Sequence, residues 1–305
     1  MNCCIFAGQG AQAPGMGRDF AETDPEAKAL FDRAGAVLGF DLAKVCFEGP
    51  AEELTKSNVC QPAIFVTSYV AYLALQKKRP TEFACAAGLS LGEWGALCAA
   101  GVLDFESTLT VLEARGRFMQ EACEAVPSGM VAIVGASADQ LKEICSRTGC
   151  TVANINSAAQ QVLSGSKDAI ASAVAAAKEL GVKRAIPLAT AGAFHSPFMA
   201  PAREKLAPVV EKVAFSAPKM PVLSNVTGKP HSSDPGAIKA AMLEQVTGTT
   251  NWAADVECAK SLGCTTFVEF GPGKVLSGLV KKIDPSLATL NVADLASLDA
   301  TVAAL

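Results

Sequence analysis

Short apolar runs alternate with longer helical patterns over the first 126 residues of the chain. The runs 2–8 and 82–88 both end in glycine, and their continuous apolar character predicts buried parallel strands. Helical patterns occupy 25–38, 60–77, 93–101 and 105–124. Because strands alternate with helices, this part of the chain predicts an α/β fold with a mostly parallel sheet.

The pattern changes near Pro127. Between 127 and 190 it reads strand, helix, strand, strand, helix, strand, an order typical of the ferredoxin-like unit. Strands are expected at 130–135, 151–157, 160–166 and 182–189, and helices at 138–149 and 168–181. We therefore expect a small ferredoxin-like domain at 127–190, inserted in a large α/β domain made of residues 1–126 and 191–305.

After this insertion the α/β pattern resumes. The apolar runs 220–228 and 265–273 predict two further strands, and the second leads into a helix from Val275. No internal repeat or low-complexity tract interrupts the pattern.

The composition narrows the class of protein. Hydrophobic residues make up 50% of the 305 residues and charged residues 18%, which is typical of a globular chain with a large core. The net charge of −4 argues against a nucleic-acid binder, which would favour a basic surface. The longest weakly charged stretch, 83–103, is broken by glycines and by Glu93, so we expect no membrane span.

The cysteines bear on metal binding and on the compartment. All eleven lack C-x-x-C pairing and zinc-type Cys/His spacing, so we expect no bound metal. Their odd number and apolar surroundings indicate reduced thiols in a reducing compartment. The first strand begins at Asn2, which argues against a signal peptide. These features favour the cytoplasm; the alternative is an organelle stroma or matrix after removal of a targeting segment.

The segment "GLSLG" at 88–92 matches G-x-S-x-G between a predicted strand and a predicted helix. This is the context in which such a motif forms a nucleophile elbow, so it predicts Ser90 as a nucleophile. The alternative is a turn serine that caps the helix. Glu93, in the first turn of that helix, is expected only to stabilise the helix dipole.

A serine nucleophile needs a base and an oxyanion hole. The chain has two histidines: His195 lies among small and apolar residues, whereas His231 lies in the polar segment "GKPHSSDP" and is expected to be solvated. His195 is therefore the predicted base, and the alternative is a structural histidine. The backbone N–H groups of Leu91 and of Gln9, in "GQGAQ", are the predicted oxyanion donors. A phosphate-binding loop is the alternative for "GQGAQ", although G-x-G-x-x-G is incomplete there.

Seven ordered blocks resemble the malonyl-CoA:acyl carrier protein transacylases, and the acyltransferase domains of polyketide synthases are similar. The blocks are "FAGQGAQAPGMG", "GPAEELTKSNVCQPAIF", "AGLSLGEWGAL", "RGRFMQEA", "GAFHSPFM", "PVLSNVTG" and "EFGPGKVLSGL". The resemblance runs from about residue 4 to 282 and implies an α/β-hydrolase-like core with a ferredoxin-like insert.

The resemblance also implies residue roles. Ser90 and His195 correspond to the nucleophile and base, and Gln9 and Leu91 to the oxyanion donors. Arg115 corresponds to the arginine that pairs with the malonyl carboxylate; its alternative is a solvated helix arginine paired with Glu113 or Glu121.

The resemblance implies roles for four further residues. Asn251 falls where the family uses a backbone carbonyl to orient the histidine. Phe194 corresponds to a residue that favours malonyl over methylmalonyl groups, and Asn156, like Asn154, to a polar residue of the cofactor channel. The chain departs from the family pattern at Leu89, where the elbow usually has histidine, and before Trp252, where a proline is common.

The implied reaction is a ping-pong transfer of malonyl from malonyl-CoA to the phosphopantetheine thiol of acyl carrier protein, in fatty acid or polyketide biosynthesis. We expect a monomer without a permanently bound cofactor. The basic residues Lys183, Arg184, Lys281 and Lys282 are candidate contacts for the acidic carrier protein. One alternative is a serine hydrolase or thioesterase, which would not need Arg115. Another is a non-catalytic module that binds the carrier protein.

Overall fold

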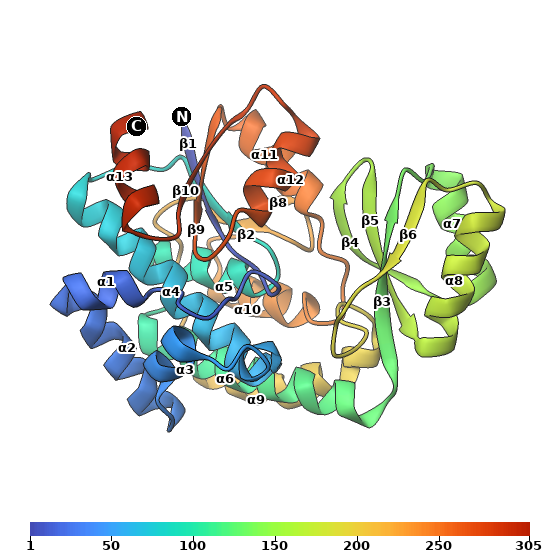
Figure 1. The fold of residues 1–305 in the computed structure, drawn as a ribbon, viewed down its shortest axis with the longest axis horizontal. Helices are drawn as coiled ribbons and strands as arrows, with labels where there is room; N and C mark the ends of the chain where they lie inside the picture. The colour runs from blue at the N-terminus through green and yellow to red at the C-terminus, as the bar shows by residue number, and fades with distance from the viewer.

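A computed structural model describes residues 1–305 and contains a larger and a smaller unit (Figure 1). The elements before the smaller unit are β1 (Asn2–Phe6), α1 (Arg18–Thr23), α2 (Pro25–Leu38), α3 (Leu42–Glu48), η1 (Glu53–Thr55), α4 (Ser57–Lys78), β2 (Cys85–Gly88), α5 (Leu91–Ala99) and α6 (Phe105–Ala125). The smaller unit contains β3 (Ser128–Val134), α7 (Ala138–Thr148), β4 (Thr151–Ser157), β5 (Gln160–Ser166), α8 (Lys167–Glu179) and β6 (Arg184–Pro187). The remaining elements are η2 (Pro197–Met199), α9 (Ala200–Lys212), β7 (Leu223–Ser224), β8 (Lys229–Pro230), α10 (Pro235–Glu244), α11 (Trp252–Ser261), β9 (Thr266–Phe270), α12 (Val275–Ile283), β10 (Ala288–Val292) and α13 (Leu295–Ala304).

The sheet of the larger unit has the strand order β10-β9-β1-β2, and every neighbouring pair is parallel. Successive side chains of a strand point to opposite faces, so β1 contributes to two cores. Cys4 and Phe6 belong to a core of 56 buried residues on one face, while Cys3 and Ile5 belong to a core of 14 on the other. The sheet is thus buried on both faces, which explains why the β1 sequence is apolar at consecutive positions.

The smaller unit is an antiparallel sheet of strand order β4-β5-β3-β6. Its elements follow one another as strand, helix, strand, strand, helix, strand, which is the predicted order. Helices α7 and α8 pack on the sheet around a separate apolar core that includes Val131, Leu163 and Ile144. The α/β class predicted from the sequence is therefore confirmed.

The prediction of a strand over 220–228 is wrong for most of its length. Only Val222 bridges to the larger sheet, through Ala86, and only Leu223–Ser224 form β7, a two-residue strand paired with β8. The backbone N–H groups of Thr227 and Gly228 both donate to Ser224 O, so the chain turns there. The sequence pattern also did not identify the edge strand β10.

Helix α4 is long and apolar enough to cross a bilayer, and it is the only helix of which this holds. In the structure 72% of the most apolar 18-residue stretch of α4 is buried, and the helix packs along α6. Its apolar composition is thus explained by its place at the centre of the larger core.

Candidate active site

A sharp turn joins β2 to α5, and Ser90 is at its apex. Ser90 has φ 57° and ψ −107°, a conformation that is strained for a residue with a side chain. The flanking glycines permit this turn: a Cβ at Gly92 would lie 2.2 Å from Phe6 O, and one at Gly88 would lie 2.0 Å from Gly92 C. The elbow geometry predicted from G-x-S-x-G is therefore present.

His195 and Ser90 are in contact. Ser90 Oγ lies 2.8 Å from His195 Nε2, although the residues are 105 positions apart in the chain. His195 Nδ1 lies 2.8 Å from the backbone oxygen of Gln245, which can only accept, so Nδ1 carries the proton and Nε2 is free to receive one. Burial, and then the positive charge of Arg115, lower the pKa of His195 from 6.5 to about 4. The ring is neutral at pH 7.

The expectation that Asn251 supplies the orienting carbonyl is wrong. Gln245 has this role because it is the C-cap of α10, where carbonyl groups lack partners within the helix. Asn251 is instead the N-cap of α11: its side chain accepts from Ala254 N, and its backbone N–H donates to Asn225 O.

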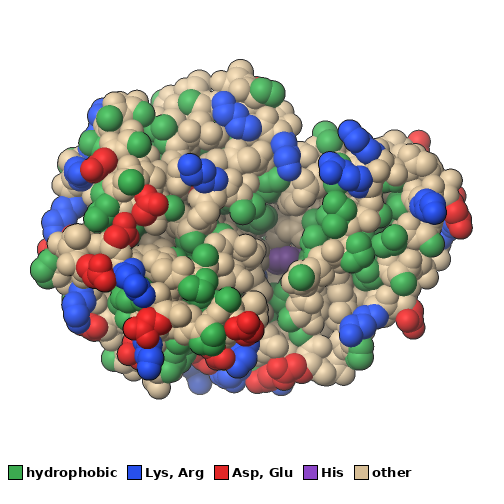
Figure 2. Space-filling model, in the orientation of Figure 1, with side chains coloured by type: hydrophobic (Ala, Val, Ile, Leu, Met, Phe, Trp, Pro, Cys, Tyr) green, Lys and Arg blue, Asp and Glu red, His purple; other side chains and the backbone are tan.

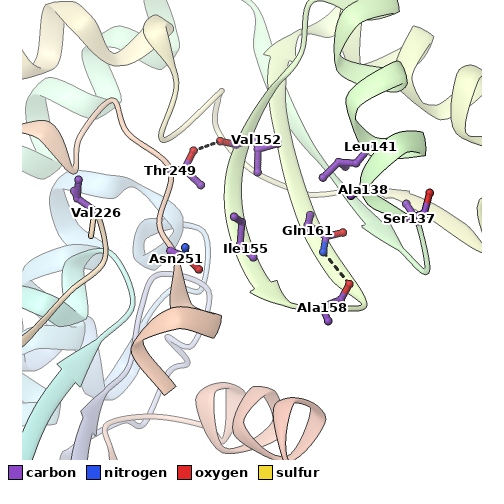
Figure 3. A pocket seen from close by; sticks show the side chains of 11 residues that line it. Ser137, Ala138, Leu141, Val152, Ile155, Ala158, Gln161, Val226, Thr249 and Asn251 are labelled. Atoms are coloured by element: carbon purple, nitrogen blue, oxygen red, sulfur yellow. Dashed lines mark hydrogen bonds between the residues drawn. The ribbon is translucent and has the colours of Figure 1, made fainter. Parts of the chain in front are cut away.

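Asn251 also lines a pocket of about 360 Å³ between the two units (Figure 3). Val226 and Thr249 of the larger unit contribute to the same pocket, opposite Val152 and Ile155 of β4. Thr249 Oγ1 donates to Val152 O at 2.6 Å and joins the two sides. The pocket is mostly apolar and lies on the face where the units meet.

Arg115, from α6, points into the site and is only 1% exposed. Its Nη2 lies 3.0 Å from Ser90 Oγ and 3.1 Å from Gln245 Oε1, and its Nη1 lies 2.7 Å from Gln61 Oε1. Burial lowers the pKa of Arg115 to about 10, so the guanidinium is still charged at pH 7. The alternative of a solvated helix arginine is wrong for Arg115.

The neighbouring arginine has the surface role instead. Arg117 pairs with Glu113 at 2.9 Å and with Glu121 at 3.7 Å, one turn away on either side along the exposed face of α6.

Gln9 and Leu91 lie on the two segments that flank the serine. Leu91 is the first residue of α5, so its N–H has no acceptor within the helix. The loop after β1 approaches the elbow closely, since a Cβ at Gly8 would lie 2.7 Å from Leu89 O. The side chain of Gln9 is linked to Arg115 through Gln61, whose Nε2 lies 3.4 Å from Gln9 Oε1.

Phe194, next to His195, and Asn156 are both buried. Phe194 is 7% exposed, packs with the larger core, and its carbonyl accepts from Ser164 Oγ at 2.6 Å. Asn156, on β4, is 8% exposed, and its Oδ1 is buried without a hydrogen-bond partner.

Asn225 holds the elbow from behind, and sequence reasoning missed it. Its Oδ1 accepts from Ser90 N at 2.7 Å, while its Nδ2 donates to Gly88 O and to Asp255 Oδ2. One amide therefore fixes the backbone on both sides of the strained residue. Burial raises the pKa of Asp255, so this carboxyl group favours its protonated form. The only sequence signal was a polar residue within the quoted run "PVLSNVTG".

Glu93 and His231 were both misjudged. The sequence predicts a solvated His231 and a Glu93 that acts only on the helix dipole, but their side chains are 2% and 1% exposed and lie 2.6 Å apart. The backbone N–H of His231 donates to Val222 O beside β2, and the His231 side chain points inward while its neighbours Pro230 and Ser232 stay exposed. Local polarity did not predict burial, because the partner of His231 is 138 residues away.

The surface is hollowed between the larger and smaller units, and a histidine side chain lies at the bottom of the hollow (Figure 2). Apolar side chains line much of its flank on the smaller unit. No three His, Cys, Asp or Glu side chains in the structure are arranged to hold a metal ion. All eleven cysteines are free thiols.

Comparison with known proteins gives consistent matches over nearly the whole chain. The family model described as "Acyl transferase domain" matches residues 3–298. The malonyl CoA-acyl carrier protein transacylase of Bacillus subtilis (strain 168) is 41% identical over 295 residues, which cover 95% of this chain and 92% of that protein.

Solved structures agree. The malonyl CoA-acyl carrier protein transacylase from Clostridium perfringens superposes with a TM-score of 0.94 at 37% identity, covering 99% of this chain and 96% of that one. A type II PKS malonyl-transacylase, solved in complex with its acyl-carrier protein, gives a TM-score of 0.95 at 36% identity and covers 100% and 99%.

Proposed function

The chain belongs to the acyl transferase family, and on that premise we propose that it transfers a malonyl group from malonyl-CoA to the phosphopantetheine thiol of acyl carrier protein. The observation that carries this proposal is the buried guanidinium of Arg115, 3.0 Å from Ser90 Oγ and beside a neutral His195. A charged donor next to the nucleophile suits an acyl group that carries its own carboxylate.

The first half of the reaction forms a malonyl-serine. His195 Nε2 takes the proton of Ser90 as Oγ attacks the thioester carbonyl, and the backbone N–H groups of Leu91 and Gln9 stabilise the tetrahedral oxyanion. The C–S bond then breaks, and His195 returns the proton to the departing thiolate of coenzyme A. The Gln245 carbonyl holds Nδ1–H throughout and stabilises the imidazolium, as a carboxylate does in a triad.

The second half reverses these steps with a different thiol. His195 takes the proton of the phosphopantetheine thiol, its sulfur attacks the malonyl-serine ester, and the proton returns to Ser90 Oγ as the ester bond breaks. No oxidant or further cofactor is required, because the reaction converts one thioester and one thiol into another thioester and another thiol.

A serine hydrolase is the main competing function, since it would share Ser90 and His195. It would give no reason to bury a cation in contact with the nucleophile, because burying a charge is costly unless it has a partner. The test is to supply malonyl-CoA with and without acyl carrier protein. Transfer to the carrier thiol supports the proposal, whereas rapid release of free malonate without carrier supports the hydrolase.

We also propose the finer fold class and the domain limits. The parallel sheet with its elbow supports an α/β-hydrolase-like core made of residues 1–126 and 191–305. The strand order β4-β5-β3-β6 supports a ferredoxin-like domain over 127–190. Asn156 of this domain, with its unpartnered Oδ1, is proposed to face the substrate channel.

The remaining proposals concern setting and partners. Free thiols support a reducing compartment, for which the cytoplasm is proposed, with an organelle stroma or matrix as the alternative. The protein acts as a monomer in fatty acid or polyketide biosynthesis. Basic side chains flank the upper part of the hollow (Figure 2), and Lys183, Arg184, Lys281 and Lys282 are proposed contacts for the acidic carrier protein.

Replacing His195 with alanine should slow malonyl loading by roughly 10²–10⁴-fold, the usual contribution of a general acid–base group.

The wild type should show an unusual pH dependence. The base must be neutral to act, and the pKa of His195 is lowered to about 4, so kcat/KM should stay constant as the pH falls through 6.5. Stopped-flow loading rates between pH 4 and 8 measure this. A fall in kcat/KM centred near pH 6.5, the ordinary histidine pKa, would contradict the assignment of the base.

The same shift makes a stability prediction for the wild type. Because the unfolded chain takes up the proton on His195 near pH 6.5 and the folded chain only near about 4, the free energy of unfolding should fall across that window as the pH drops. Comparison with His195→Gln, which cannot titrate, isolates this contribution in urea unfolding curves.

Replacing Phe194 with alanine should widen the space beside the acyl group. We expect the ratio of methylmalonyl to malonyl loading to rise by on the order of tenfold, because a methyl group is worth about 1–3 kcal/mol of discrimination. Competition between the two CoA thioesters, read by intact mass, measures the ratio. An unchanged ratio in a folded variant would remove Phe194 from the acyl pocket.

A further inference from the structure

Gln245 contacts all three residues of the proposed reaction. Its backbone oxygen accepts from His195 Nδ1. Its side-chain amide accepts from Arg115 Nη2 through Oε1, at 3.1 Å, and donates to Ser90 O through Nε2, at 2.9 Å. A change in the orientation of this amide would therefore reach Arg115 directly. A further contact that holds this orientation, beyond Arg115 and Ser90, comes from a residue outside the proposed mechanism.

Glu93 reinforces the orientation of the Gln245 amide that Ser90 O also favours. Gln245 Nε2 lies 2.5 Å from Glu93 Oε2. An ionised carboxylate can only accept a hydrogen bond, and a guanidinium can only donate. The amide satisfies both neighbours in one orientation alone, with its NH₂ toward Glu93 and its oxygen toward Arg115.

His231 holds Glu93 in turn. His231 Nε2 lies 2.6 Å from Glu93 Oε1, and the backbone N–H of Asn225 donates to Oε2 at 3.3 Å. With Gln245, these make three donors to one carboxylate, and the Glu93 side chain is 1% exposed. A buried carboxylate that is fully hydrogen-bonded is held rigidly.

Glu93 also balances the charge of Arg115 without touching it. Burial lowers the pKa of Arg115, and the negative charge of Glu93 acts in the opposite direction across the Gln245 amide. Glu93 thus offsets part of the cost of burying the guanidinium, whose Nη2 contacts both Ser90 Oγ and Gln245 Oε1. A carboxylate paired with Arg115 directly would compete with the substrate; one placed behind Gln245 does not.

We propose that Glu93 and His231 are positioning residues that, through Gln245, aim the Arg115 guanidinium at the acyl carboxylate and so contribute to selection of malonyl over acetyl groups. This rests on the proposed function, because it assigns a selectivity to the same site. Neither side chain has a hydrogen bond to Ser90 Oγ, His195 or Arg115, so both act through Gln245.

The test measures selectivity rather than rate alone. Glu93→Gln keeps the shape but loses the charge and replaces one carboxylate oxygen with an NH₂ group, so the Gln245 amide loses its charged acceptor and is held less firmly toward Arg115. We expect the ratio of malonyl-CoA to acetyl-CoA loading rates to fall by on the order of tenfold, through loss of malonyl loading. Loading is followed by intact mass of the full chain, and thermal unfolding checks each variant.

Glu269→Gln is the matched control. Glu269 is equally buried, and it accepts from Leu276 N and Ser277 N at the start of α12, with no contact to the site. This variant should lose stability and keep the malonyl-to-acetyl ratio. A fall in the ratio of the same size in Glu269→Gln would show a general effect of destabilisation and would overturn the proposal.

Two His231 variants keep the test decisive if Glu93→Gln does not fold. His231→Gln retains an N–H donor toward Glu93 and should keep the ratio, whereas His231→Leu removes the donor and should lower it. Equal ratios in both would overturn the proposal. A wild type that loads acetyl as fast as malonyl would instead refute the proposed function, so the two failures are distinguishable.

Discussion

Replacing Ser90 with alanine should abolish the covalent malonyl adduct while leaving the fold intact. The Oγ atom is the only group of residue 90 that contacts His195 and Arg115, at 2.8 and 3.0 Å. The backbone of the turn is held separately, by Asn225 on Ser90 N and by Gln245 on Ser90 O. Because those contacts do not use the side chain, the variant should keep the elbow. Intact mass after mixing with malonyl-CoA measures the adduct.

A serine outside the site provides the control. Ser166 caps α8, where its side chain accepts from Ala169 N. Ser166→Ala should cost about 1 kcal/mol of stability, as lost helix caps do, and should load malonyl normally. An adduct that persists in Ser90→Ala and maps to a cysteine would end the proposed mechanism.

Replacing Arg115 with alanine should reverse the preference between acyl donors. The guanidinium is 1% exposed and lies against Ser90 Oγ, so a malonyl carboxylate that enters this site without it would be left buried and unpaired. Charge-assisted hydrogen bonds contribute roughly 1.5–3 kcal/mol each. We therefore expect kcat/KM for malonyl-CoA to fall by on the order of 10²-fold or more. Acetyl-CoA has no carboxylate to desolvate, so its transfer should be unharmed or improved.

Arg117 offers a matched control two residues away. Its pairs with Glu113 and Glu121 are on the exposed face of α6, so Arg117→Ala should leave the preference unchanged. Arg115→Lys should recover only part of malonyl transfer, because an ammonium lacks the planar fork of the guanidinium. Equal losses of malonyl and acetyl transfer in a folded Arg115→Ala variant would make Arg115 a structural residue.

Features fixed by local sequence were predicted well. Helix α2 has the predicted limits, because Asp24 caps its start and Gly39, with φ 74°, ends it. The elbow at Ser90 follows from two glycines, each two residues from the serine, and β3 through β6 follow from the alternation of short apolar runs with helical patterns. The caps, the glycines and the apolar periodicity all lie within the segments whose structure they determine.

Features fixed by distant partners were not predicted. Gln245 orients His195 from 50 residues away and contacts Ser90 from 155, and nothing in its own segment indicates either role. His231 lies in a polar segment typical of a solvated turn, yet Glu93 holds it in the interior. A buried hydrogen-bond network depends on which segments the fold brings together, so composition and periodicity do not reveal it.

The most direct test of the central claim is to mix the protein with malonyl-CoA, map the adduct by peptide mass spectrometry, and then add acyl carrier protein bearing phosphopantetheine. The account predicts one malonyl group on Ser90, and its transfer to the carrier thiol with regeneration of the free serine. An adduct on another residue, or a malonyl-Ser90 that water removes faster than the carrier protein does, would contradict it.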